Sequence, residues 1–272
     1  MIREVYKMSV KIETILSPAR KQQMTALVTS CLTAFPAPLS VPTDGDVFFF
    51  WEQEETIHSP ELYAFLALYL AEDGLWECSA FTLPNRRQNG YFSDLLEAAE
   101  RAYPDYEFSF PVPDLETSLP AKSALASIGA EFWYQEHMMA LQADNPSWST
   151  FFPENPDFCL SLQIQPESSE ASDSSYNLSV HGFFSENCVA SCSLAISTHK
   201  SQTTCCLHHV LVPPSLRGQG WGTRFLYTLL PALKEQGVTS FLLQVSGDNL
   251  PAISLYKKTG FQITETLSYY LY

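Results

Sequence analysis

Leu211-Val-Pro-Pro-Ser-Leu-Arg-Gly-Gln-Gly-Trp-Gly-Thr-Arg-Phe225 is the stretch on which the interpretation of this chain depends. Residues 203–212 are rich in β-branched and apolar side chains, which is typical of a strand, and residues 222–235 carry apolar side chains at helical spacing. Arg217 and three glycines therefore lie on a strand-to-helix turn. Glycine permits positive φ and close approach of a ligand, and the first amides of a helix lack intrahelical partners. The stretch predicts a pyrophosphate-binding turn, unless it only joins the strand to the helix.

Length and composition favour a cytoplasmic protein without a membrane span. The 272 residues suffice for one large domain or two of ordinary size. The longest apolar run, residues 64–71, is far shorter than the roughly 18 residues that a span requires. No apolar segment follows Arg3 and Lys7, so we expect no secretory signal. Seven cysteines, an odd number without disulfide-framework spacing, favour a reducing compartment.

The charge balance argues against some partners. The formal net charge is −15 and no basic patch is visible, so no nucleic acid partner is expected. The excess of acid fits attraction of a cationic small molecule, or simply a soluble surface. The run Cys205-Cys206-Leu207-His208-His209 suggests zinc, but neighbouring residues of a strand point to opposite faces. We therefore expect no metal.

The two halves of the chain resemble each other. Four residues recur in the same order at nearly constant spacing, pairing Pro84 with Pro214, Arg87 with Arg217, Gly90 with Gly220, and Gly129 with Gly260. The differences fall at the turn and beyond it, where Gln88, Phe92, Ser118 and Leu125 replace Gly218, Gly222, Asn249 and Tyr256. The pattern predicts a first copy that keeps the scaffold and has lost the site. Two unrelated α/β domains are the alternative.

The expected division is a first domain over residues 1–143, a linker over 144–157, and a second domain over 158–272. Periodicity, caps and turn residues predict the elements. The expected strands are 9–16, 47–52, 62–70, 76–83, 106–112, 132–141, 158–165, 176–184, 188–197, 203–212, 239–245 and one or two over 261–272. The expected helices are 17–35, 93–102, 121–128, 222–235 and 249–259. The polar run 166–175 predicts a mobile loop.

A second motif follows the turn, Asn249-x-x-Ala252-Ile253-x-Leu255-Tyr256-x-Lys258-x-Gly260-Phe261. Together the two motifs resemble those of the GNAT superfamily of acyl-CoA-dependent N-acyltransferases. The resemblance is specific over residues 205–261, and the first half is similar to a degenerate copy in tandem. It implies an α/β (α+β) fold of two GNAT-like mixed-sheet domains, with central strands flanked by helices. It also implies transfer of an acetyl group from acetyl-CoA to a primary amine of a small molecule or peptide.

The resemblance implies roles for individual residues. Backbone groups of the strand would hold the pantetheine and the thioester, amides of the turn would hold the pyrophosphate, and Asn249 would contact the pantetheine arm. Tyr256 would donate a proton to the departing sulfur, although a core aromatic is the alternative. The implied cofactor-binding residues are Val210, Leu211, Val212, Arg217, Gly218, Gln219, Gly220, Trp221, Gly222, Thr223, Asn249 and Tyr256.

The general base stays open among three side chains and a water chain. His208 is the first candidate, because imidazole titrates in the right range and the residue would share a strand face with Val210 and Val212. His209 would then face the other side, and Glu186 lies on a predicted hairpin turn.

The second half departs from the family at its beginning. Residues 165–176 leave no room for the two helices that usually cover the acceptor site, so we expect the first half or the linker to supply part of that pocket. A non-catalytic acyl-CoA-binding module is the alternative function. A dinucleotide-dependent oxidoreductase is disfavoured, because Gly218, Gly220 and Gly222 give G-x-G-x-G rather than G-x-G-x-x-G.

Overall fold

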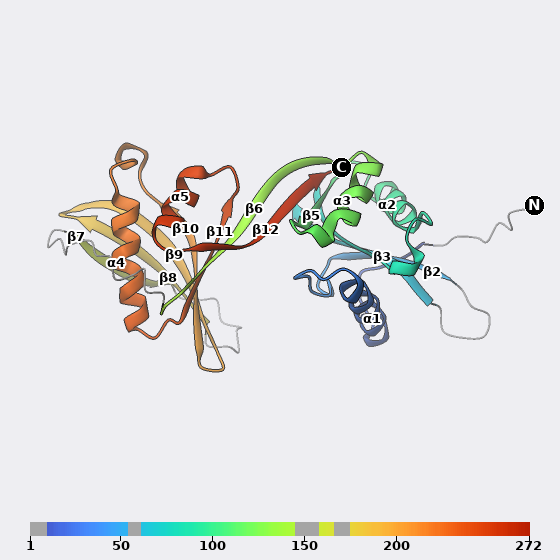
Figure 1. The fold of residues 1–272 in the computed structure, drawn as a ribbon, viewed down its shortest axis with the longest axis horizontal. Coiled ribbons are helices and arrows are strands. Elements are labelled where there is room, and N and C mark those ends of the chain that lie inside the picture. Colours follow the sequence, from blue (N-terminus) through green and yellow to red (C-terminus); the bar gives the residue numbers. More distant parts are fainter. Residues whose placement is uncertain (1–9, 54–60, 145–157, 166–174) are drawn as a thin grey trace, which may run out of the picture. The chain divides into compact units, whose positions relative to one another are not determined.

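The computed structural model describes residues 10–53, 61–144, 158–165 and 175–272. The chain forms two compact units (Figure 1). In sequence, the second unit is inserted between the two segments of the first. Unit 1 comprises Met1–Tyr134 and Leu267–Tyr272, and unit 2 comprises Gln135–Thr266. The elements are mixed α/β, as expected from the sequence, and no helix in the described ranges is long and apolar enough to cross a membrane.

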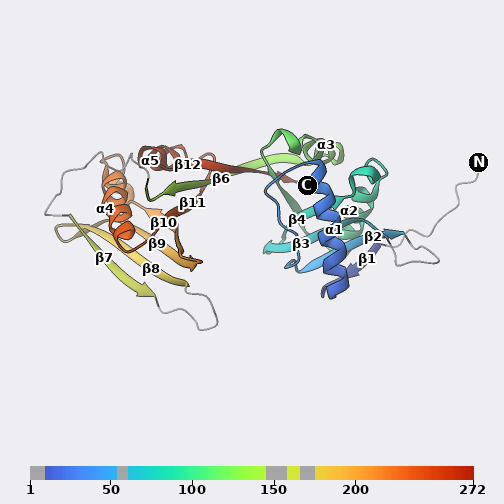
Figure 2. The ribbon, with the colours of Figure 1, turned by 60° about the horizontal axis from the view of Figure 1, so that its bottom comes forward.

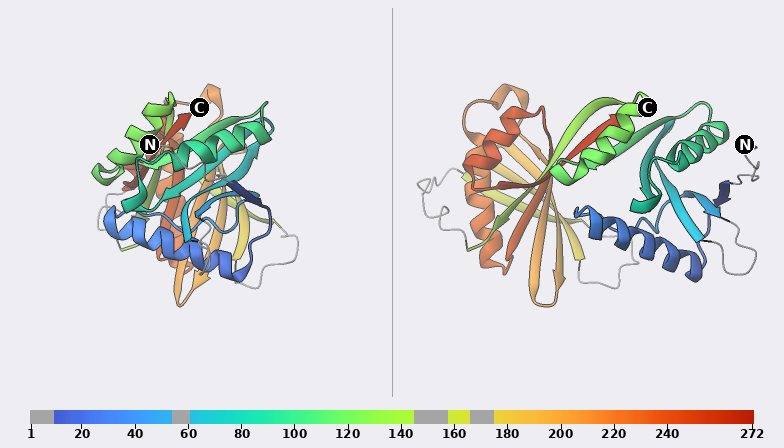
Figure 3. Two further views of the ribbon diagram at one scale, coloured as in Figure 1. Left: turned by 90° about the vertical axis from the view of Figure 1, so that its right-hand side faces the viewer. Right: turned by 45° about the vertical axis from the view of Figure 1, so that its right-hand side comes forward.

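Unit 1 is a sheet with helices on both faces (Figure 3). Helix α1 packs on one face against Phe48, Phe50 and Phe65, whereas α2 and α3 pack on the other. Its elements are β1 Val10–Glu13, α1 Pro18–Ala34, β2 Val47–Gln53, β3 Glu61–Glu72, β4 Leu75–Thr82, α2 Tyr91–Ala102, β5 Glu107–Pro113, α3 Leu119–Ile128 and the beginning of β6 Glu131–Gln142.

Local sequence explains where α1 begins and ends. The Ser17 hydroxyl accepts a hydrogen bond from the Arg20 amide at 3.2 Å, and Pro18 occupies the first helical position. Phe35 ends the helix before Pro36, because proline cannot donate the next helical hydrogen bond. These features confirm the prediction for this helix.

Unit 2 is a sheet with helices on one face. Both of its helices contribute to one buried cluster that includes Leu194, Leu207 and Phe241. Figure 2 shows α4 and α5 on the same side of the strands. The elements are β7 Phe158–Gln165, β8 Ser175–Phe184, β9 Asn187–His199, β10 Gln202–Leu211, α4 Trp221–Glu235, β11 Ser240–Ser246, α5 Leu250–Lys258 and β12 Gln262–Leu271. The expected strands flanked by helices are thus present in both units, with helices on both faces in unit 1 and on one face in the described part of unit 2.

The two repeats exchange their last strands. β12, which ends the second repeat, pairs antiparallel with β5 of the first, and β6, which ends the first repeat, pairs antiparallel with β11 of the second. The strand order is β1-β2-β3-β4-β5-β12 followed by β6-β11-β10-β9-β8-β7. The units therefore divide at Tyr134 and Leu267 rather than at the expected boundary near residue 143. The expected linker, except Asp144, and nearly all of the expected loop 166–175 lie outside the described residues.

Candidate functional site

The glycine turn of unit 2 leads from β10 into α4. A 3-10 turn over Pro214–Leu216 comes first, and Gly220 is the residue that caps α4. Gly218 and Gly220 have φ of +75° and +84°, and a Cβ on either would meet nothing within 4 Å. The first intrahelical hydrogen bond runs from the Arg224 amide to the Gly220 carbonyl at 3.0 Å. The backbone amides just before Arg224 therefore have no acceptor within the helix. This open end of a helix suits an anion.

The same turn is present in unit 1. Arg87 and Arg217 have φ/ψ of −64°/162° and −66°/154°, and Gly90 caps α2 with φ +88°. Each arginine donates through Nε to the carbonyl five residues earlier, Arg217 to Val212 at 3.1 Å and Arg87 to Thr82 at 3.5 Å. Gln88 stands at the position of Gly218 with φ +61°. The matching geometry supports the internal repeat over two unrelated domains.

The reason for glycine at position 222 differs from the expectation. We predicted that Gly222 would let a phosphate approach, but a Cβ there would lie 3.0 Å from Leu255 Cδ2 and 3.4 Å from Val212 Cγ2. Gly222 is buried, and the space beside it is filled by α5 and the end of β10. Its lack of a side chain therefore serves the packing of α4 on α5, whereas its amide remains in the first turn of the helix.

Strands β10 and β11 diverge beside the turn. Their parallel pairing runs from Thr204↔Ser240 to Leu207↔Leu243, although β10 continues to Leu211 and β11 to Ser246. Beyond this point β10 pairs only with β9 among the described strands, so its other edge has no strand partner there. A strand edge with unpaired amides and carbonyls can bind an extended chain that carries amide groups.

A β-bulge lies at the divergence. The register of β10 with β9 shifts between His208↔Ser193 and Leu211↔Ser191, and His209 has φ +51°. The bulge reverses the alternation of side chains, because it inserts one unpaired residue. The expectation that His208 shares a face with Val210 and Val212 is therefore wrong. His208 and Leu211 share one face, whereas Val210 and Val212 pack against the helix-side core.

Tyr256 lies on α5, within the core cluster of unit 2. The side chain is 7% exposed and its ring meets the Phe261 ring edge-on, with centroids 5.9 Å apart. Burial, followed by the neighbouring Cys192, raises the pKa of Tyr256 to about 12. The phenol therefore stays protonated through the neutral range and can donate a hydrogen bond. The residue is also part of the hydrophobic core, which is the alternative interpretation from the sequence.

The remaining predicted residues surround the turn. The side-chain oxygen of Asn249 accepts from the Ala252 amide at 3.3 Å and caps α5, which leaves the side-chain NH2 group as the donor that a ligand could reach. Thr223 is buried. The Trp221 ring centroid lies 4.9 Å from the Phe184 ring centroid and 5.4 Å from Cζ of Arg224. The buried indole N–H of Trp221 has no hydrogen-bond partner in the described part of the structure.

The cysteine–histidine run does not converge. Cys205 is buried in the helix-side core, whereas Cys206 and His208 lie on the other face of β10. Among the residues that the structure describes, no group of three or more metal-ligating side chains is present. Glu186 is exposed on the turn between β8 and β9. The structure thus places His208, Glu186 and Tyr256 on separate elements, with His208 and Tyr256 on opposite faces of the sheet.

Part of unit 2 is similar to a known protein family. The model of the acetyltransferase (GNAT) family matches residues 138–261, which lie within Gln135–Thr266. A mycothiol acetyltransferase from Saccharomonospora viridis is 40% identical over 55 residues, which is 20% of this chain. The match spans only 18% of that relative's length.

Solved structures share the fold of both units. A GCN5-related N-acetyltransferase from Sphaerobacter thermophilus has a TM-score of 0.65 at 13% identity, covering 97% of this chain and 95% of its own. A tandem GNAT protein from the clavulanic acid biosynthesis pathway has a TM-score of 0.64 at 15% identity, covering 96% and 98%. At these identities the comparison shows a tandem GNAT fold.

Proposed function

We propose that this chain is an acetyl-CoA-dependent N-acetyltransferase with one donor site, in unit 2. The proposal is direct transfer of an acetyl group to a primary amine of a small molecule or peptide. The observation that carries it is the open turn of Gly218 and Gly220 beside the divergence of β10 and β11. The family match over residues 138–261 supports it.

The turn and the strand edge would hold the donor. Backbone amides from Gly218 to Thr223, with the positive end of the α4 dipole, suit a pyrophosphate. The Nε–H of Arg217 donates to the Val212 carbonyl, so the terminal guanidinium nitrogens would bind the phosphates. The edge of residues 208–211 would pair with the amides of the pantetheine arm, and an amide there would polarise the thioester carbonyl.

Tyr256 would assist the leaving thiolate. A phenol with a pKa of about 12 is a weaker acid than a thiol of about 8.5, so complete proton transfer is uphill by about 3.5 units, or about 5 kcal/mol. We therefore assign Tyr256 the role of a hydrogen-bond donor to sulfur, which transfers its proton only as negative charge develops there.

His208 would act on the opposite face, where the amine approaches. It is exposed at the end of the bulge and can accept a proton directly or through water. Glu186 and His209 remain candidates for this role. Because His208 and Tyr256 lie on opposite faces of the sheet, His208 would act on the amine from one face and Tyr256 on the leaving sulfur from the other.

Two measurements test the proposal. Isothermal titration should show one CoA bound per chain, and a thiol-release assay with a library of amines should show acetylation, with mass spectrometry to identify the product. Binding without turnover of any amine would favour the non-catalytic acyl-CoA-binding module. No binding would contradict the proposal as a whole.

A further inference from the structure

The connection from β11 to α5 in unit 2 is short. β11 ends at Ser246 and Asn249 caps α5, so the connection consists of Gly247 and Asp248. The Asn249 amide donates to the Ser246 carbonyl at 3.1 Å, and the Ser246 hydroxyl bonds the Asp248 carboxylate. The position of Asn249 therefore follows directly from the end of β11.

Gly247 is the residue at which this connection meets β6. Its amide donates to the Gln135 carbonyl at 2.8 Å, one residue beyond the strand pair Ser246↔Glu136. A Cβ on Gly247 would lie 3.1 Å from Cβ of Gln135, 3.3 Å from the Gln135 carbonyl oxygen and 3.3 Å from Nε2 of His137. Distances this short leave little space for a side chain, so glycine permits the close approach of the two backbones.

His137 lies on the helix side of β6. It pairs with Val245 of β11, whose side chain belongs to the helix-side core, and directly opposed residues of an antiparallel pair share a face. Its Nδ1 lies 2.9 Å from the Thr266 hydroxyl of β12. The imidazole thus contacts β12 through one nitrogen and faces Gly247 with the other.

The matching connection in unit 1 is longer. β5 ends at Pro113 and α3 begins after Ser118, so residues 114–117 lie between them. Ser118 has helical φ/ψ of −87°/−3° and makes no side-chain capping hydrogen bond within the described residues, whereas the Asn249 side chain accepts from the Ala252 amide. The helix that follows this connection therefore forms in unit 1 without a short connection or a side-chain cap, so the fold alone does not require them.

We propose that Gln135 and His137 are positioning residues, which hold Asn249 in place for the pantetheine arm of the donor. The inference rests on the proposed function of unit 2, in which the NH2 group of Asn249 would donate to this arm. Both positioning residues belong to β6, the strand that ends the first repeat. The first repeat would thus complete the donor site of the second.

Small displacements of the connection matter for this role. A Cβ on Gly247 would require its neighbours to move by a few tenths of an ångström. Groups of a binding site must stay within about 0.5 Å of their productive positions, so a shift of this size is enough to weaken a hydrogen bond. Asn249 would move with the connection, because it lies two residues beyond Gly247 and caps α5.

Calorimetric titration of CoA into two single variants and their combination tests the role. Gly247→Ala would push the connection away from β6 and should raise the Kd for CoA about fivefold or more, the loss expected for one hydrogen bond. Asn249→Ser keeps an oxygen that can cap α5 but lacks the NH2 group, so it should show a similar loss. The combined variant should bind no more weakly than Asn249→Ser alone, because Gly247 acts through Asn249.

His137→Ala tests the same role without adding an atom to the connection, and it applies even if Gly247→Ala does not fold. It should also raise the Kd, whereas His137→Gln, whose side-chain amide can occupy the place of Nε2, should retain most of the affinity. Gly45→Ala is the matched control, because a Cβ there would lie 3.2 Å from the Leu68 carbonyl oxygen of unit 1. It should lower the Tm and leave the Kd for CoA unchanged.

The outcomes separate this inference from the proposed function. An unchanged Kd in folded Gly247→Ala, His137→Ala or Asn249→Ser would overturn the positioning role while leaving CoA binding in place. So would additive losses in the combined variant, a loss in His137→Gln equal to that in His137→Ala, or a loss of affinity in Gly45→Ala equal to that in Gly247→Ala. Absence of CoA binding by the unmodified protein would overturn the proposed function and this inference with it.

Discussion

Gln88 and Gly218 occupy the same position of the same turn, with φ of +61° and +75°. The backbone of this turn therefore accepts a side chain at a positive φ, and the glycine of unit 2 is not required for folding alone. A Cβ at Gly218 would meet nothing within 4 Å, so a side chain there would project into the space proposed for the pyrophosphate. This relationship separates the requirements of the fold from those of the proposed site.

Gly218→Gln should therefore fold and lose affinity. The cost of the left-handed conformation is about 1 kcal/mol, a few degrees in Tm. The glutamine side chain would obstruct the turn and weaken CoA binding at least tenfold by calorimetry. An unchanged Kd would show that the pyrophosphate does not lie at this residue.

Tyr256→Phe should lower kcat with little change in the Kd for CoA. The hydroxyl donates to the leaving sulfur only as charge develops, so its loss affects the transition state. Tyr227→Phe is the control, because its hydroxyl bonds the Lys258 carbonyl at 2.8 Å and links α4 to α5 without facing the proposed thioester. Equal kcat for wild type and Tyr256→Phe would remove this residue from the mechanism.

The raised pKa of Tyr256 also predicts a dependence of stability on alkaline pH. The native phenol has a pKa of about 12, above the ordinary value of 10.0, so the folded state holds its proton longer than the unfolded state. The contribution of this pKa shift to the free energy of unfolding is fully present below pH 10 and decreases as the pH rises toward 12. Denaturant titrations between pH 9 and 12 should show this decrease in wild type and a smaller one in Tyr256→Phe. Identical slopes would contradict the assigned shift.

His209→Gly should preserve activity and raise stability slightly. His209 adopts φ +51°, which costs a residue with a Cβ about 1 kcal/mol and costs glycine little. His209→Val should instead lose more than 1 kcal/mol, because a β-branched side chain fits this region poorly. Urea denaturation and kcat/KM check both variants. If His209→Gly is stable but inactive, the imidazole rather than the backbone of the bulge is the functional group.

Glu52→Gln should destabilise unit 1 by about 3 kcal/mol. Burial alone would raise the pKa of Glu52, but hydrogen bonds and charges of Arg20 and Lys11 outweigh it and lower this pKa below its usual range. The carboxylate therefore contributes stability above its unfolded pKa, and that stability is lost as the pH falls through the lower folded value. Denaturant titrations from pH 7 to 3 test this sign.

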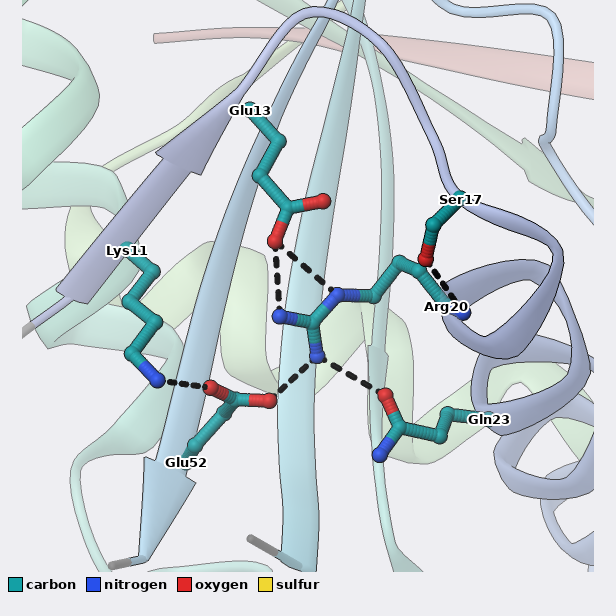
Figure 4. Close-up of polar contacts among 6 residues, drawn as sticks. All are labelled: Lys11, Glu13, Ser17, Arg20, Gln23 and Glu52. Carbon is teal, nitrogen blue, oxygen red and sulfur yellow. Dashed lines mark hydrogen bonds and ion pairs between the residues drawn. The ribbon is translucent and has the colours of Figure 1, made fainter.

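Glu97→Gln is the matched control for Glu52. Glu97 pairs with Arg101 on the surface, where both side chains are more than half exposed, so its removal should cost less than 1 kcal/mol. Equal losses for the two variants would mean that the buried network of Figure 4 does not stabilise unit 1.

Much of the fold and the turn could be predicted from local sequence. Ser17, Pro18 and the paired glycines act within a few residues of the chain, and their caps and φ angles follow from local chemistry. The bulge at His209 also left a signal. Apolar side chains that face the helix-side core occupy odd positions at Cys205 and Leu207 of β10 but even positions at Val210 and at Val212 just after it, whereas Trp76, Cys78 and Ala80 of β4 keep one phase. We assumed unbroken alternation and therefore assigned His208 to the wrong face.

The exchange of β6 and β12 could not be predicted in the same way. Locally, each segment is predicted simply as a strand, and either strand could have completed its own repeat. The choice depends on contacts between residues far apart in sequence, such as the stacking of Tyr134 on Tyr269 at 4.4 Å.

Calorimetric titration of CoA into wild type, Gly220→Val and Gly90→Val tests the central claim most directly. The two glycines cap equivalent helices with φ of +84° and +88°, and a Cβ on either meets nothing within 4 Å. Both variants should lose similar stability, but only Gly220→Val should lose CoA binding, by more than tenfold. Wild-type affinity in Gly220→Val, or an equal loss in Gly90→Val, would contradict a single donor site in unit 2.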